Sequence, residues 1–288
     1  MLSERPLFSV IMANYNNSRF MEYAVRSLVE QSYDRWELII VDDCSTDGSV
    51  EIIKELIDKF PDKSIRFEVN KQNSGVGYTK GRCVDLCRGE LVGILDPDDE
   101  LVAGALEKMV AYHAEHPEAS LIYSNCFICG PDLEVRYPSV TSSIPAGTTM
   151  LDCWDKPGYS LSHFTCFKKK SYSASGGFDP YIRIAEDKDL YYKMEEVGKL
   201  VHVDDLLYKY RIHDAGLSTG KTASYGGLWH AYVLMKAFER RNYDFESKSK
   251  HMTEVLFESP VKVTKEFKIG SFFISPLRKL KGLLNKSN

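Results

Sequence analysis

Three carboxylates stand close together at Asp96, Asp98 and Asp99, directly after the apolar run of residues 91–95. A buried strand that ends in several carboxylates needs something to offset their charge, and a divalent cation does so. Oxygen ligands favour Mg²⁺ or Mn²⁺, which complete their shells with water and substrate phosphates. The competing interpretation is an acidic turn that caps a helix beginning near Leu101, because Asp is a good N-cap residue. On these residues alone both interpretations stand.

The elements that must position these carboxylates alternate between strands and helices in the first half of the chain. The predicted strands are residues 8–13, 37–41, 65–69, 90–95 and 120–124. The predicted helices are residues 18–32, 46–60, 77–88 and 102–116, the second opening with an N-cap-like Ser-Thr-Asp-Gly run. Repeated strand–helix–strand units predict a Rossmann-like, mostly parallel α/β sheet flanked by helices, with ligands bound beyond the carboxyl ends of its strands.

Polar clusters follow three of these strands, as Asn14-Tyr15-Asn16, Asp42-Asp43 and the acidic run 96–99. Parallel strands bring their carboxyl ends to one edge, so the three clusters should converge there. This convergence favours a metal and nucleotide site over a simple helix cap. Beyond residue 126 the alternation stops. A loop is predicted at 137–158, and regular structure returns at 185–197, 200–203, 207–212 and 228–241.

Composition is that of an ordinary globular protein of 288 residues, with a net charge of −4 that gives no general attraction to nucleic acid. The seven cysteines are an odd number, and the N-terminus lacks a signal-peptide pattern, so the expected location is the cytosol. No apolar stretch approaches the roughly 18 residues that a membrane-spanning helix needs.

Seven motifs, in order, make the chain from about residue 7 to about residue 218 resemble the family 2 inverting glycosyltransferases of the GT-A fold. They are the stretches 9–16, 38–48, 73–77, 95–99, 176–179, 185–190 and 210–213. Each motif alone is weak, and their order makes the resemblance strong. The resemblance implies a GT-A fold with a smaller C-terminal acceptor-side region and a helical tail.

The resemblance also implies how a UDP-sugar would be held. Asp43 would hold the uracil, with Ala13 and Tyr15 closing over the base. Lys80 falls where the family usually carries Arg and would supply a positive contact, and Asp96 would reach the ribose. These five residues are the predicted nucleotide-binding set.

The same resemblance assigns Asp98 and His213 to the metal, Mn²⁺ or Mg²⁺, and the Glu186-Asp187 pair to catalysis, with Asp187 as the base. Two alternatives stay open on the residues themselves. Asp187 is also placed as a first-turn acid favoured by the helix dipole, and His213 as a structural histidine after a strand.

Three further residues, Trp154, Tyr159 and His163, sit where acceptor-binding residues often lie in this family, although aromatic side chains more often belong to a core. The predicted domains are a glycosyltransferase domain over 1–218, with a nucleotide-binding half at about 1–127 and an acceptor half at about 128–218, and a C-terminal helical region over 219–288.

The stretch 262–288 holds seven Lys and Arg residues against one acid, Glu266, together with nine large apolar residues. A basic amphipathic segment suits the anionic inner face of a cell membrane. A terminal helix packed on the catalytic domain is the alternative.

The resulting prediction is a metal-dependent inverting transferase that moves a hexosyl or N-acetylhexosaminyl group from a UDP-sugar to a hydroxyl of a glycan or lipid-linked acceptor. By resemblance its setting is surface polysaccharide, lipopolysaccharide or capsule synthesis. Two alternatives are a sugar-phosphate nucleotidyltransferase, which would want a Gly-rich basic loop in place of Asn14-Tyr15-Asn16-Asn17, and a non-catalytic glycan-binding relative.

Overall fold

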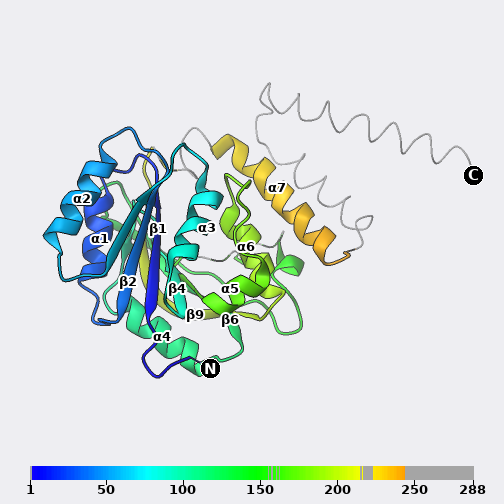
Figure 1. Ribbon diagram of the computed structural model, residues 1–288. Helices are drawn as coiled ribbons and strands as arrows, with labels where there is room; N and C mark the ends of the chain where they lie inside the picture. Colours follow the sequence, from blue (N-terminus) through cyan, green and yellow to red (C-terminus); the bar gives the residue numbers. More distant parts are fainter. Residues whose placement is uncertain are drawn as a thin grey trace, which may run out of the picture. The chain divides into compact units, whose positions relative to one another are not determined.

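The computed structural model describes residues 2–243 except 155, 157, 160, 162, 215 and 217–222 (Figure 1). The predicted basic tail and most of the predicted region 219–288 lie outside these residues. Met1–Tyr243 form one compact unit. Within the described residues, no helix is both long enough and apolar enough to cross a bilayer.

One mixed sheet carries the strands of the described part, in the order β3-β2-β1-β4-β8-β6-β9-β5, with β7 paired to β6. Its strands are β1 (Phe8–Asn14), β2 (Trp36–Asp42), β3 (Ile65–Val69), β4 (Leu91–Ile94), β5 (Glu100–Leu101), β6 (Ala119–Cys129), β7 (Val135–Ser139), β8 (Thr165–Lys168) and β9 (Lys199–Arg211).

The first four strands of the chain are parallel, as the sequence predicts. Strands β1, β2 and β4 are covered on both faces, which explains why each is an almost unbroken apolar run. The parallel register places Asn14 beside Asp42, so the polar clusters that follow β1 and β2 emerge at the same edge.

Beyond β4 the sheet becomes mixed, so the expected mostly parallel arrangement holds only for its first half. Strand β8 runs antiparallel to both β4 and β6, and β5 runs antiparallel to β9. The segments 200–203 and 207–212, where regular structure is predicted, belong to one continuous strand, β9, whose pairing with β6 shifts register near Asn125. The polar pair Asp204-Asp205 interrupts the apolar pattern there without ending the strand.

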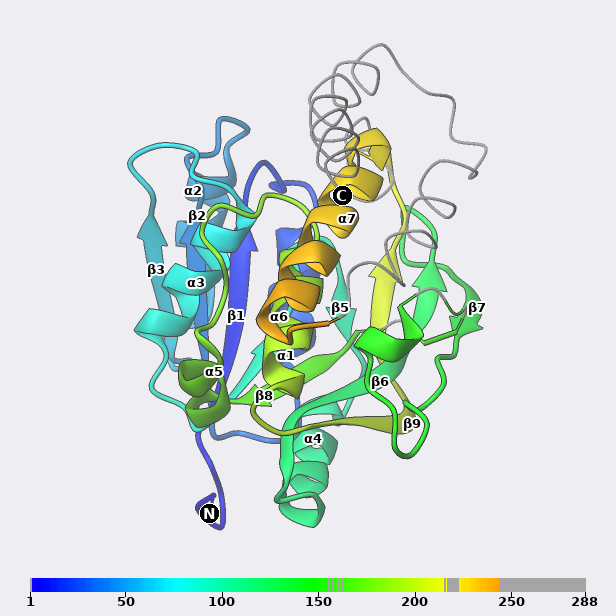
Figure 2. The same cartoon turned by 90° about the vertical axis from the view of Figure 1, so that its right-hand side faces the viewer.

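Helices cover both faces of the sheet (Figure 2). Helices α1 (Met21–Val29), α2 (Ser49–Lys59) and α4 (Ala105–Glu115) contribute to the core on one face. The opposite face carries α3 (Val76–Leu86), α5 (Lys169–Ser175) and α6 (Glu186–Glu195), with α7 (Ala223–Arg240) packed against α6.

Three predicted helix starts are each three residues too early. The first helix begins at Met21 and not at residue 18. The second helix begins at Ser49, after Gly48 in the left-handed region, and Asp47 accepts hydrogen bonds from the backbone and side chain of Ser49. Residues 100–101 form the short strand β5, and α4 begins at Ala105. Because a strand directly follows Asp99, the acidic run does not cap a helix.

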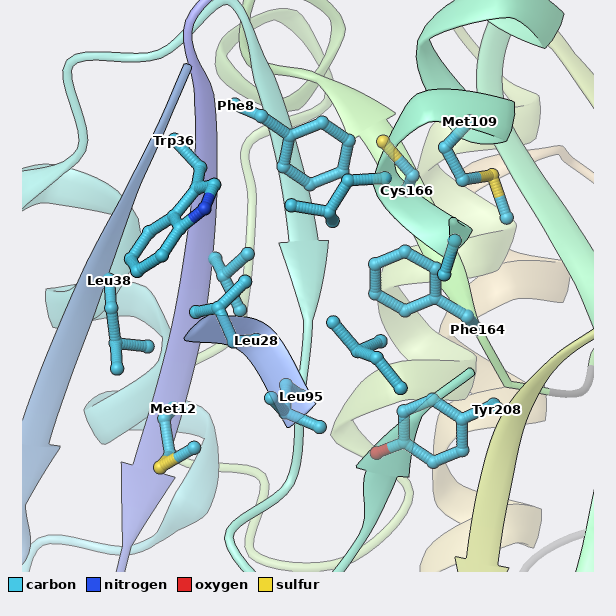
Figure 3. Close-up of a cluster of buried hydrophobic side chains, with 14 of the residues drawn as sticks. Phe8, Met12, Leu28, Trp36, Leu38, Leu95, Met109, Phe164, Cys166 and Tyr208 are labelled. Atoms are coloured by element: carbon cyan, nitrogen blue, oxygen red, sulfur yellow. The ribbon is translucent and has the colours of Figure 1, made fainter. Parts of the chain in front are cut away.

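The core lies where α1, α2 and α4 meet the sheet, and it joins the two halves of that sheet (Figure 3). Phe8 of β1, Phe164 beside β8 and Tyr208 of β9 are fully buried and stacked in series, with ring centroids 6.3 Å and 6.1 Å apart. At roughly 25 cal/mol per Å² of buried apolar area, such large rings stabilise the sheet and fix the positions of its strand ends.

The segment 137–158, which the sequence predicts to be a loop, contains some regular structure. Strand β7 continues to Ser139, and a short 3₁₀ helix occupies Leu151–Cys153.

Candidate active site

Asp98 and His213 face each other across the ends of β4 and β9. Asp98 Oδ2 lies 2.9 Å from His213 Nε2, and both side chains are largely buried. The antiparallel pairing of β5 with β9, Glu100 opposite Lys209, explains this meeting, because continuing that register leads Asp98 toward the end of β9. The two predicted metal ligands, which are 115 residues apart in the chain, are thus brought together.

Arg211 holds the turn that carries Asp98. Its backbone N–H donates to Asp99 Oδ1 at 2.7 Å, and its guanidinium donates to the carbonyl oxygen of Asp98. The guanidinium also lies over the Phe20 ring, 4.5 Å from the centroid, and the same ring packs against His213 at 4.6 Å. Burial raises the pKa of Asp99 well above its usual value, and the neighbouring charges of Asp98 and Asp96 add to this effect.

Lys80 joins the end of β4 to the start of α6. Its ammonium lies 3.2 Å from Asp96 Oδ1 and 2.9 Å from Glu186 Oε1. Burial opposes the charge of Lys80, but Asp96, Glu186 and Asp187 outweigh burial and raise its pKa well above the usual value. Burial likewise opposes ionisation of Asp96, but the charge of Lys80 prevails and the pKa of Asp96 is lowered. Burial raises the pKa of Glu186 against the pull of Lys80.

The three carboxylates of the acidic run therefore have separate protein partners. Asp96 pairs with Lys80, Asp98 with His213, and Asp99 with a backbone N–H. In the part of the chain that the structure describes, no group of three or more His, Cys, Asp or Glu side chains could hold a metal ion together. Among the described residues, Asp98 and His213 are the two predicted metal ligands that the structure brings together.

Asp43 is buried at the end of β2 and faces the loop before α3. Its carboxylate accepts hydrogen bonds from Asn70 Nδ2 at 2.7 Å and from the backbone N–H groups of Ser74 and Gly75 at 2.9 and 2.8 Å. Ala13 and Tyr15 lie at the end of β1, with Tyr15 47% exposed. These positions share one edge of the sheet.

Asp187 lies in the first turn of α6, directly after Glu186, where its carboxylate accepts the backbone N–H of Lys188 at 2.7 Å. Ala185 precedes the helix in the left-handed region, with φ of 64°. Because Lys80 of α3 pairs with Glu186, it also holds in place the first turn of α6, which carries Asp187.

The predicted acceptor residues differ in how they relate to this site. His163 stacks against Tyr208 and Tyr210 of β9, with ring centroids 5.2 and 5.8 Å from its own. Burial and Lys80 have the largest effects on the pKa of Asp96, and His163 lowers that pKa further. Trp154 and Tyr159 are half-buried in the segment after the 3₁₀ helix. The structure brings His163 toward the strand ends.

Sequence reasoning missed two residues that organise the strand ends. Tyr208 Oη accepts the backbone N–H of Asp96 at 3.0 Å, and Arg211 holds the Asp98–Asp99 turn. Both lie on β9, more than 100 residues beyond the acidic run. Arg211 belongs to the Tyr210–His213 motif, so its position two residues before His213 could have indicated a role at the site.

A protein family and several solved structures match this chain. The family model described as glycosyl transferase family 2 matches residues 9–175. This match spans more than half of the chain. The chain belongs to glycosyl transferase family 2. This membership makes the protein a glycosyltransferase and removes the nucleotidyltransferase alternative.

Relatives of this family 2 glycosyltransferase include two Escherichia coli proteins. A chondroitin synthase is 29% identical over 223 residues, which cover 76% of this chain but only 31% of the relative. The colanic acid biosynthesis glycosyl transferase WcaA is 24% identical over 264 residues, covering 85% of this chain and 87% of the relative. The chain thus spans about a third of the chondroitin synthase and most of WcaA.

Solved structures show the same fold. TarS of S. aureus in complex with UDP-GlcNAc superimposes with a TM-score of 0.64 at 18% identity, covering 91% of this chain and 77% of that one. The mannosyltransferase PcManGT from Pyrobaculum calidifontis, in complex with GDP-Man and Mn²⁺, gives 0.61 at 18% identity, covering 84% and 66%. The expected GT-A fold of this family 2 glycosyltransferase is therefore confirmed.

Proposed function

We propose that this glycosyltransferase moves a hexosyl or N-acetylhexosaminyl group from a UDP-sugar to a hydroxyl of a glycan or lipid-linked acceptor, with metal dependence and inversion, in surface polysaccharide synthesis. The observation that carries the proposal is that two groups of charged side chains lie together at one end of the sheet. The Asp98–His213 pair stands at the strand ends, and Lys80 ties the adjacent Asp96 to the helix that begins with Glu186 and Asp187.

Donor binding would use the strand ends of the nucleotide half. Asp43, Ala13 and Tyr15 hold the base, and Asp96 contacts the ribose. The positive charge of Lys80 keeps Asp96 ionised, so that its carboxylate can accept hydrogen bonds from the ribose hydroxyl groups. UDP is favoured over GDP by the family pattern, although the fold neighbours include proteins bound to each class of donor.

The chemistry of Asp98 and His213 fits a divalent ion. One carboxylate oxygen and one imidazole nitrogen lie 2.9 Å from each other, and both atoms are suitable ligands for Mn²⁺. Two protein ligands leave most of an octahedral shell for water and diphosphate oxygens. When bound, such an ion would stabilise the negative charge that the leaving diphosphate gathers.

Asp187 is proposed as the base that accepts the proton of the acceptor hydroxyl as that oxygen attacks the anomeric carbon. A single displacement from the face opposite the diphosphate inverts the anomeric centre and needs no covalent sugar–enzyme intermediate. Glu186 serves this step indirectly, because its contact with Lys80 orients the first turn of α6.

A donor panel tests the proposal. Nucleotide release is measured with UDP-hexoses, UDP-N-acetylhexosamines and GDP-mannose in the presence of Mn²⁺ and a mixture of candidate acceptor glycans. We expect Asp187→Asn to lower turnover by roughly 10² to 10⁴ while donor binding persists. The matched control is Asp85→Asn, an exposed carboxylate on α3. Wild-type turnover in the Asp187→Asn variant would remove the base from this position.

The setting in surface polysaccharide synthesis is supported by the names of the relatives, which include a chondroitin synthase and a colanic acid biosynthesis enzyme. We further propose a peripheral position on the anionic inner face of the cell membrane. Its support is the sequence of residues 262–288, with seven basic residues and one acid.

A further inference from the structure

Helix α7 is attached to α6 and to the loop before it by ion pairs between opposite charges. Arg240 lies 3.3 Å from Asp189, and Arg241 lies 2.8 Å from Glu195. Lys236 pairs with Asp179. These contacts lie toward the C-terminal end of α7 and each joins opposite charges.

One contact between the same helices is different. Lys188 Nζ lies 3.3 Å from His230 Nδ1, so a base on α6 meets a base on α7. Burial lowers the pKa of Lys188, although the carboxylate of Asp187 opposes this. Burial also lowers the pKa of His230, the charge of Lys188 lowers it further, and Asp187 again opposes. Because its pKa is lowered, the His230 ring is neutral at neutral pH and its Nδ1 can accept a hydrogen bond from the Lys188 ammonium. Protonation of the ring would place two cations at this spacing, where they repel each other.

The position of this pair gives it a different use. Lys188 directly follows Asp187, the proposed base, and His230 reaches the same place from a separate helix. Because the charge of Asp187 acts on both side chains, an acceptor bound at Asp187 would lie near the nitrogens of Lys188 and His230. Asp187 is the carboxylate whose charge acts on both of them, and a proton taken up by Asp187 during the reaction would remove that compensation.

We propose that Lys188 and His230 form an acceptor subsite for an anionic group, a sugar carboxylate or a phosphate, one residue away from the catalytic base. The assignment rests on the proposed function for the identity of Asp187. An anion placed between the ammonium and the imidazole favours protonation of the ring and then accepts charge-assisted hydrogen bonds from both groups. The enzyme then selects an acidic glycan, and the anion orients the neighbouring hydroxyl toward Asp187.

The test follows the ring signals of His230 by NMR in the full-length protein with UDP and Mg²⁺. The chain has seven histidines, and a His230→Gln spectrum identifies the signal by its loss. Sodium glucuronate and glycerol phosphate are titrated separately, with glucose as the neutral probe. We expect a saturable shift and a higher His230 pKa with at least one anion, because an anion favours the protonated ring, and no such response to glucose.

Variants separate a binding site from a structural contact. Lys188→Met is expected to weaken the response roughly tenfold or more, since it removes a charge-assisted hydrogen bond. Lys54→Met, an exposed lysine on α2, should leave the response unchanged. The relative response to glucuronate and to glycerol phosphate distinguishes a uronic acid acceptor from a phosphorylated one.

The proposal is overturned by equal shifts with glucose, by no shift with either anion, or by a full response in Lys188→Met. UDP binding is measured in the same samples. Loss of UDP binding with the anion response intact would count against the proposed function and not against the subsite.

Discussion

The structure gives Lys80 a role that the sequence alone does not predict. The resemblance predicts a positive contact with the nucleotide, and that contact remains a prediction. The structure shows a buried ammonium between Asp96, which follows strand β4, and Glu186, which begins helix α6. No spacing rule could reveal this bridge, because Lys80 and Glu186 are 106 residues apart. Residue types indicated the site, and only the folded chain shows how the charges are shared.

Replacing Lys80 with Met is expected to destabilise the fold by about 3 kcal/mol at neutral pH, because it leaves two buried carboxylates without their cation. The lowered pKa of Asp96 means that its pair with Lys80 stabilises the fold above the ordinary carboxyl pKa and loses that effect as pH falls through the lowered value. In the variant the carboxylates protonate more readily, so the difference from wild type should shrink by about pH 5.

Chemical denaturation of wild type, Lys80→Met and the exposed-site control Lys54→Met at both pH values measures this effect. A destabilisation by Lys80→Met that is the same at pH 7 and pH 5 would contradict the proposed charge sharing.

At the scale of elements, the parallel half of the fold was predictable because its strands are unbroken apolar runs between amphipathic helices. β3 (Ile65–Val69) agrees in full with the prediction, and β1, β2 and β4 agree within one residue at each end. The antiparallel second half was not predictable to the same degree. Its pairing depends on contacts such as β8 between β4 and β6, which no local pattern encodes. The start of α4 was missed because β5 intervenes after the acidic run.

Gly77 of α3 lies where this helix comes very close to the loop before α6. A Cβ atom built there would lie 2.5 Å from the carbonyl oxygen of Ile182 and against that of Asp179, in the loop that leads to α6. Gly77→Ala is therefore expected to destabilise the fold by about 1–3 kcal/mol and to lower turnover by displacing the first turn of α6.

The matched control is Gly226→Ala in α7, where a built Cβ meets nothing within 4 Å. Alanine should stabilise that helix by roughly 0.5–1 kcal/mol. Thermal unfolding and nucleotide release are measured for both variants. Equal stability of Gly77→Ala and Gly226→Ala would show that the close approach at α3 is not required.

At the scale of the whole molecule, the described unit ends at Tyr243, and the basic sequence 262–288 follows outside it. The surface-charge argument for membrane binding depends on composition alone. The full chain should sediment with vesicles containing anionic lipid and much less with neutral vesicles, at low salt.

The double variant Arg278→Glu and Lys279→Glu changes the charge of this segment by −4 and should largely abolish vesicle sedimentation, at about 1 kcal/mol per basic residue lost near the surface. UDP binding should be unaffected. Unchanged sedimentation of the double variant would reject membrane docking by this segment and leave the active-site proposal intact.

The central claim is that Asp98 and His213 hold a divalent ion which binds the donor diphosphate. Isothermal titration of UDP into the full-length protein, with and without Mn²⁺, tests it most directly. We predict binding that requires Mn²⁺ in the wild type and is lost in Asp98→Ala, whereas Asp85→Asn binds as wild type. UDP binding of equal strength without metal, or retained in full by Asp98→Ala, would contradict the claim.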